Sequence, residues 1–200
     1  MERAADIGKP PRDSAATKRR LLAAATQEFA ERGIAGARVD RIASAAQANK
    51  RQIYDYFGDK DRLFDAVLET HTGAIIDATL PIDPDDLPAY AGRLFDYHFT
   101  HPELVRLVQW ARLEGRFTPA SYGKRVDSYR RRLAVIEEAQ RRGRATSALT
   151  AQQLLTLIES LAVGWTITTG EFLVGADAPF SGRDMQREVI VETVRSLVAP

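Results

Sequence analysis

Residues 49–60 read NKRQIYDYFGDK and place two cations and a glutamine directly before three aromatic side chains. A solvated helix face has no need of so many aromatic residues, and a buried face would not carry two neighbouring cations. Asn49 is a good N-cap and Gln52, three positions later, completes a capping-box pattern, so a helix is expected to begin here. The sequence therefore predicts a helix whose charged surface touches something outside the chain.

The side chains of this helix separate into two faces at 100° per residue. Ile53 and Phe57 lie on the side suited to packing, while Arg51 and Tyr54 point the other way and Lys50 flanks the N-terminal tip. A helix that displays guanidinium, phenol and ammonium groups at its start is typical of a recognition helix, which reads base edges in the major groove of DNA.

Two helices are expected before it. Leu21, Ala25 and Phe29 recur at helical spacing until Gly33, a plausible stop, and residues 39–46 form a second, short helix. Residues 47–48 then make a tight turn into the quoted stretch. Helix, short turn and exposed helix together predict a helix-turn-helix. Residues 1–16, which contain two prolines and polar neighbours, are expected to be a flexible arm.

Composition limits the function classes. The 200 residues are 44% hydrophobic, enough for a compact fold, and no cysteine is available for a disulfide, a thiolate zinc site or a cysteine nucleophile. Neither a signal segment nor a long apolar run is evident, so we expect a soluble, cytoplasmic protein. Residues 1–60 carry 12 Lys and Arg against 8 Asp and Glu, whereas the remaining 140 carry 16 against 19. This uneven charge is consistent with a polyanion partner for the N-terminal part of the chain.

The runs RRLLAAATQEFAERGIAG and VDRIASAAQANKRQIYDYFGDKDRLFDAV together resemble the DNA-binding domain of the tetracycline-repressor (TetR) family of bacterial transcriptional regulators. The resemblance covers roughly residues 17–68 and is carried by Phe29, Gly33, Ile42, Ala43, Ala46, Tyr54, Phe57, Lys60 and Leu63. Two positions depart from the family pattern. Gln47 stands where glycine is usual, and Arg38 stands where a serine or threonine commonly leads into the second helix.

The resemblance implies roles for individual residues. Tyr54 and Lys60 would hold backbone phosphates, while Lys50, Arg51 and Gln52 would meet base edges, where Arg and Lys suit guanine and Gln suits adenine. Further backbone contacts are expected from Thr17, Lys18, Arg38 and Arg41.

Several of these residues have a plainer alternative. Gln52 can simply close the capping box, Arg51 can pair with Asp55, and Tyr54 can be partly buried support. Basic residues of the arm, Lys9 and Arg12, can enter a minor groove or belong to a disordered tail.

Beyond residue 68 the resemblance implies only an architecture. The expected class is all-α, with about nine helices: a three-helix DNA-binding domain over residues 17–62 and a larger helical effector-binding and dimerisation domain over residues 63–200. After the second domain's proline-rich link PIDPDDLP, helices are expected over 87–98, 102–115, 120–142, 151–174 and 183–198.

The helix over 151–174 is apolar around nearly its whole circumference from Leu154 to Ile167, which indicates burial on more than one side. Pairing of this helix and the last one with their two-fold copies would explain the pattern, as would packing inside one chain. Family members resemble the former arrangement, so a homodimer is expected.

An effector pocket is expected in the second domain. Aromatic side chains would line it and a few polar groups would orient the ligand, although aromatic residues at helical spacing are also plain core. The candidates are Tyr90, Phe95, His98, Trp110, Arg112, Glu114, Tyr129, Trp165 and Thr168. His98 and His101 lie three apart, but with one other histidine in the chain no metal site and no cofactor is predicted.

Enzyme motifs are not found: the sequence holds no serine elbow, Walker loop, dinucleotide glycine pattern or HExxH, and we predict no catalytic residues. The resemblance to the TetR family implies a ligand-responsive repressor that binds a near-palindromic DNA operator as a homodimer. The alternative is a DNA-binding dimer without a small-molecule ligand, regulated through a protein partner.

Overall fold

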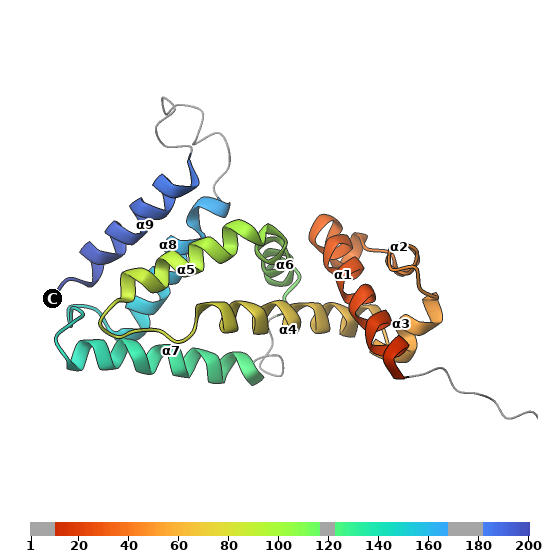
Figure 1. The fold of residues 1–200 in the computed structure, drawn as a ribbon, viewed down its shortest axis with the longest axis horizontal. Helices are drawn as coiled ribbons and strands as arrows, with labels where there is room; N and C mark the ends of the chain where they lie inside the picture. Colours follow the sequence, from red (N-terminus) through yellow and green to blue (C-terminus); the bar gives the residue numbers. More distant parts are fainter. Residues whose placement is uncertain (1–10, 117–122, 168–181) are drawn as a thin grey trace, which may run out of the picture. The chain divides into compact units, whose positions relative to one another are not determined.

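The computed structural model describes residues 11–116, 123–167 and 182–200, and within these ranges it holds nine α-helices and no strand (Figure 1). The predicted all-α class is confirmed. In chain order the helices are α1 (Pro11–Gly36), α2 (Val39–Ala45), α3 (Lys50–Phe57), α4 (Lys60–Thr79), α5 (Leu87–Thr100), α6 (Pro102–Leu113), α7 (Gly123–Arg141), α8 (Ala151–Ile167) and α9 (Arg183–Val198).

Two compact units make up the chain, Met1–Thr70 and His71–Pro200. The division falls within α4, further along that helix than the boundary expected after residue 62. The first turns of α4 therefore belong to the N-terminal unit and its last turns to the C-terminal unit.

An apolar centre holds the N-terminal unit together. Phe29 of α1 meets Phe64 of α4 edge to face, with ring centroids 5.1 Å apart and planes at 88°. The predicted inner face of α3 is buried as well, because Ile53 is fully enclosed and Phe57 nearly so. The fully buried residues around them are Leu21, Ala25, Ile42, Leu63 and Val67.

Helix α1 differs from its prediction at both ends. It begins at Pro11, so residues 11–16, which were expected in the flexible arm, are helical. The expected stop at Gly33 appears as a break inside the helix, because Gly33 has φ 66° and ψ −179°, a conformation that glycine adopts without steric cost. The chain then completes one more turn to Gly36.

The predicted capping box at the start of α3 is confirmed. The Arg51 N–H donates to Asn49 Oδ1 at 2.9 Å, and the Asn49 N–H donates to Gln52 Oε1 at 2.9 Å. Both groups would otherwise be unpaired N–H donors at a helix start, so the side chains fix where α3 begins.

The turn between α2 and α3 contains Gln47 at φ 51°, in the left-handed region that favours glycine. Among the described residues it is the one non-glycine with a positive φ. A side chain at that φ brings Cβ close to the following carbonyl oxygen, which strains the backbone.

We expect Gln47→Gly to raise the free energy of unfolding of the N-terminal unit by about 0.5 to 1 kcal/mol, because glycine removes this strain. Thermal and chemical denaturation measure the change. Gln27→Gly is the matched control: Gln27 is exposed within α1, where glycine should cost about 1 kcal/mol. Destabilisation by both substitutions would contradict a strained turn.

In the C-terminal unit, α5 packs along α9 and α8, and α7 packs on α8 (Figure 1). Asp86 caps α5, since its side chain accepts from the Ala89 N–H at 3.1 Å. Thr150 and Gln153 form a capping box at the start of α8, with exchanged bonds of 2.9 and 3.2 Å. The fully buried core of these helices is formed by Tyr90, Ala91, Phe95, Ile136, Ala139, Leu154, Leu155, Ile158, Ala162 and Val194.

The apolar circumference of α8 is only partly enclosed by its own chain. Leu154, Leu155 and Ile158 are fully buried, yet Leu157 is 40% exposed and Ile167 49% exposed. The first residues of the helix expected over 120–142 and the last residues of the helix expected over 151–174 lie outside the described residues. In the described ranges, no helix combines the length and apolarity that crossing a bilayer requires.

Candidate DNA-binding surface and effector site

The exposed side of α3 presents the predicted base-reading and phosphate-binding groups. The Arg51 side chain is 86% exposed and its Nε lies 3.9 Å from Asp55 Oδ2, the outer limit of an ion pair. Tyr54 is 45% exposed, so its phenol can be reached from solvent. Arg51 and Tyr54 are therefore available to a partner along one face of the helix.

Lys50 and Gln52 are engaged within the protein. The Lys50 ammonium lies 2.9 Å from Asp40 Oδ1 of α2, and this hydrogen bond raises the pKa of Lys50. The half-buried Gln52 side chain closes the capping box with its Oε1. Base contact by either residue would compete with these bonds, whereas contact by Arg51 would not.

Lys60, at the start of α4, is bound to carbonyl groups. Its Nζ donates to Ile34 O at 2.6 Å and to Ala37 O at 3.3 Å. Those carbonyls lie just beyond the break at Gly33, in and after the last turn of α1. Lys60 therefore links α4 to the end of α1, in addition to the contact with a DNA phosphate that the sequence predicts.

Glu28 of α1 organises the start of α2. Its Oε1 accepts from the Arg38 backbone N–H at 2.9 Å and from Arg41 Nε at 2.7 Å. Burial raises the pKa of the Glu28 carboxyl, but these bonds outweigh burial and hold it below its ordinary value. Arg38 makes no side-chain cap of its own, so Glu28 compensates for the missing hydroxyl at this position.

The two predicted contacts near the start of α1 differ in exposure. Thr17 is buried, and its Oγ1 accepts from Arg20 Nη2 at 3.3 Å. Lys18 is exposed, with its Nζ 5.7 Å from the centre of the Phe57 ring. Lys18 is thus placed to meet a phosphate without rearrangement, whereas Thr17 is not.

Four aromatic members of the predicted effector set meet in one cluster of the C-terminal unit. Tyr90 and Phe95 of α5 are fully buried, while Tyr129 of α7 and Trp165 of α8 are partly buried against the same core. These four residues share one apolar core. That arrangement is expected both for the lining of a ligand pocket and for an ordinary hydrophobic core.

The remaining predicted effector residues are placed differently. Arg112 and Glu114 are exposed at the end of α6, and Trp110 of the same helix is partly buried. Burial lowers the pKa of His98 on α5, which favours its neutral form. Thr168 lies outside the described residues.

A polar group that the sequence reasoning missed lies beside the aromatic cluster. Tyr90 Oη donates to Glu159 Oε1 at 3.1 Å, and Arg132 Nη1 donates to the same oxygen. Burial raises the pKa of the Tyr90 phenol, and the Glu159 charge raises it further, so the phenol remains a donor. Burial likewise raises the pKa of Glu159, against the opposing effect of Arg132. One carboxylate within the apolar run LLTLIESLAV was the signal that could have revealed this group.

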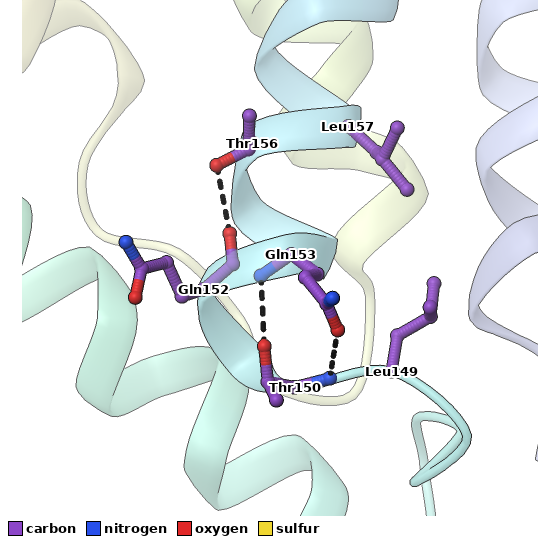
Figure 2. A pocket seen from close by; sticks show the side chains of 6 residues that line it. All are labelled: Leu149, Thr150, Gln152, Gln153, Thr156 and Leu157. Carbon is purple, nitrogen blue, oxygen red and sulfur yellow. Dashed lines mark hydrogen bonds between the residues drawn. The ribbon is translucent and has the colours of Figure 1, made fainter.

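A shallow depression of about 500 Å³ lies elsewhere, at the start of α8 (Figure 2). Figure 2 shows the Thr150 and Gln153 capping bonds at its base, with Leu149 and Leu157 on one side. Its lining consists of Leu149, Thr150, Gln152, Gln153, Thr156 and Leu157, so it includes no predicted effector residue. Within the described ranges, no three His, Asp or Glu side chains gather as metal ligands would.

Two family models match the chain. Residues 21–67 match the model described as bacterial regulatory proteins, tetR family, which covers the helix-turn-helix. Residues 86–196 match the model described as tetracyclin repressor-like, C-terminal domain, which covers the α5–α9 region.

Relatives with known roles or structures are similar over long stretches. The helix-turn-helix-type transcriptional repressor SCO4008 of Streptomyces coelicolor is 41% identical over 192 residues, covering 94% of this chain and 97% of that protein. The transcriptional repressor NicS of Pseudomonas putida is 38% identical over 100 residues, 46% of either chain. The crystal structure of the transcriptional regulator SCO4942 from Streptomyces coelicolor superposes with a TM-score of 0.79 at 38% identity, covering 91% of this chain and 98% of that one.

Proposed function

Because this chain belongs to the TetR family of helix-turn-helix transcriptional regulators, we propose that it is a repressor that binds a near-palindromic operator as a homodimer and releases it on binding a small molecule. Membership of a family of regulators also confirms the prediction that the chain is not an enzyme. Its place of action would be the cytoplasm, where bacterial DNA lies.

The exposed face of α3 is the observation that supports operator binding. The capping box fixes the start of α3, and Arg51 stands two residues into the following helix with its guanidinium almost fully in solvent. A helix that enters the major groove reads bases with its first residues, and Arg suits the two acceptors of guanine. Tyr54 on the same exposed side would hold a phosphate and fix the register.

Binding-site selection from random duplex DNA tests this proposal. We expect two inverted half-sites whose centres lie about one helical turn, or a multiple of it, apart, because a two-fold dimer presents two copies of α3. Selection of single, unpaired half-sites would contradict binding as a symmetric dimer.

Exposed apolar side chains on the last two helices support the dimer. Leu157 and Ile167 of α8 and Met185 and Val189 of α9 each keep 38% or more of their surface exposed in the single chain. Gly164 lies two turns after Leu157, and a Cβ added there would meet nothing within 4 Å. A second copy of α8 and α9 would cover these residues in a four-helix arrangement.

We expect Val189→Glu to convert the dimer to monomer at micromolar concentration and to lower operator affinity, because it places a charge in an apolar contact. Sedimentation velocity and operator titration measure both effects. Val108→Glu on α6 is the matched control, since Val108 is also 40% exposed. A wild-type monomer, or equal behaviour of both variants, would contradict dimerisation through α8 and α9.

A further inference from the structure

Side chains from three helices form a polar cluster inside the C-terminal unit: Tyr90 of α5, Arg132 of α7 and Glu159 of α8. Tyr90 and Arg132 both donate to Glu159 Oε1. Glu159 Oε2 receives no hydrogen bond from the described residues. Among the described residues, this second carboxylate oxygen therefore has no donor.

The helix that carries Arg132 also carries an unused donor. Arg132 donates Nη1 to Glu159 and Nε to Ser128 O at 3.4 Å, and its guanidinium also interacts with the Tyr90 phenol. Ser128 lies one turn before Arg132, on the stripe of α7 that continues to the buried Ile136 and Ala139. The Ser128 side chain is fully buried and its Oγ has no hydrogen-bond partner among the described residues. A buried hydroxyl without a partner costs free energy, so its retention calls for an explanation.

The surroundings of the cluster are apolar but not sealed. Tyr129, Leu133 and Trp165 pack against the core that contains Tyr90, and each stays partly exposed. The Arg132 and Glu159 side chains are 20% and 33% exposed. A small molecule could thus approach the cluster while its apolar body contacts these walls.

Charge decides which polar group fits. Arg132 and Glu159 neutralise each other, so an ionised ligand would add an uncompensated charge in a poorly solvated place, at a high desolvation cost. An uncharged amide avoids that cost. Its carbonyl oxygen can accept from Arg132 and Ser128, and its N–H can donate to the open oxygen of Glu159.

We propose that Ser128, Arg132 and Glu159 recognise an uncharged, mainly apolar effector that carries an amide or lactam group. This inference rests on the proposed function, because it assumes that the C-terminal unit binds a small-molecule effector. The carbonyl oxygen accepts from Ser128 Oγ and the Arg132 guanidinium, and the N–H donates to Glu159 Oε2.

Three probes with one ring system separate the charge classes: 2-naphthamide, 2-naphthoate and 2-naphthylmethylamine. Their binding to the full chain is measured by calorimetry and by saturation-transfer NMR at neutral pH. We expect 2-naphthamide to bind at least about tenfold more tightly than either ion. Preference for the carboxylate or the amine, or no binding by any of the three, would overturn the assignment.

Ser128→Ala tests the site itself. It should weaken 2-naphthamide about 3- to 10-fold, while the melting temperature stays the same or rises, because an unpartnered buried hydroxyl is removed. Ser160→Ala is the matched control, since Ser160 is exposed and its Oγ already donates to Thr156 O at 2.7 Å. Unchanged 2-naphthamide affinity in Ser128→Ala would overturn the site.

A screen for compounds that release the selected operator distinguishes this inference from the proposed function. A releasing compound that binds wild type and Ser128→Ala equally would leave effector control standing and overturn the site. If no compound in a metabolite library releases the operator, the proposed control of DNA binding by a small-molecule effector is contradicted.

Discussion

Arg51→Ala should lower operator affinity about 5- to 150-fold, equivalent to about 1 to 3 kcal/mol, and relax the preference at one base pair in each half-site. The Arg51 side chain is 86% exposed and its contact with Asp55 is long, so its removal should leave the fold intact. Competition binding against operators substituted at each position, at fixed salt, measures both the loss and its location.

Lys60→Ala is the contrasting variant. A lost phosphate contact weakens all DNA sequences alike and lowers the salt dependence of binding. Lys60 also donates to Ile34 O and Ala37 O, so this variant should lose about 1 to 3 kcal/mol of folding stability, which Arg51→Ala should not. If Arg51→Ala and Lys60→Ala weaken binding to all DNA sequences by the same factor, Arg51 does not read a base.

The local features of the DNA-binding unit could be predicted because their determinants lie a few residues apart. The capping box of α3 needs only Asn49 and Gln52, and the break at Gly33 needs only a residue that tolerates positive φ. The inner face of α3 followed from helical periodicity, and Ile53 is fully buried. Such patterns are visible to a reader of the sequence because no tertiary information enters them.

The missed features join residues far apart in the chain. The Lys60 bond to Ile34 spans 26 positions, and the Tyr90 bond to Glu159 spans 69. Helical periodicity says which face is buried but not which helix lies opposite, so it cannot pair a charge with its partner. For that reason the sequence predicts aromatic residues and nearby polar residues as effector candidates, but not Arg132 and Glu159, which contact Tyr90 in the fold.

Coupling between the two units is expected to run through α4, whose residues belong to both. Lys60 ties its first turn to the end of α1, while Ile75 and Thr79 near its other end are partly or fully buried, Ile75 against the core of the C-terminal unit. We expect an effector that displaces the helices packed in that core to tilt α4 and change the separation of the two copies of α3. The dimer would then no longer match both half-sites.

Such an effector must bind the misaligned state more tightly, and a coupling of about 1 to 3 kcal/mol would weaken operator binding about 5- to 150-fold. Linkage requires that saturating operator weaken the effector by the same factor, because one coupling free energy governs both equilibria. The measurement is effector affinity by calorimetry, with and without operator duplex, using a scrambled duplex of equal length and charge as control. Equal effector affinity with operator and with scrambled DNA would mean that the effector site is uncoupled from DNA binding, and the protein would then be a DNA-binding dimer regulated by another route.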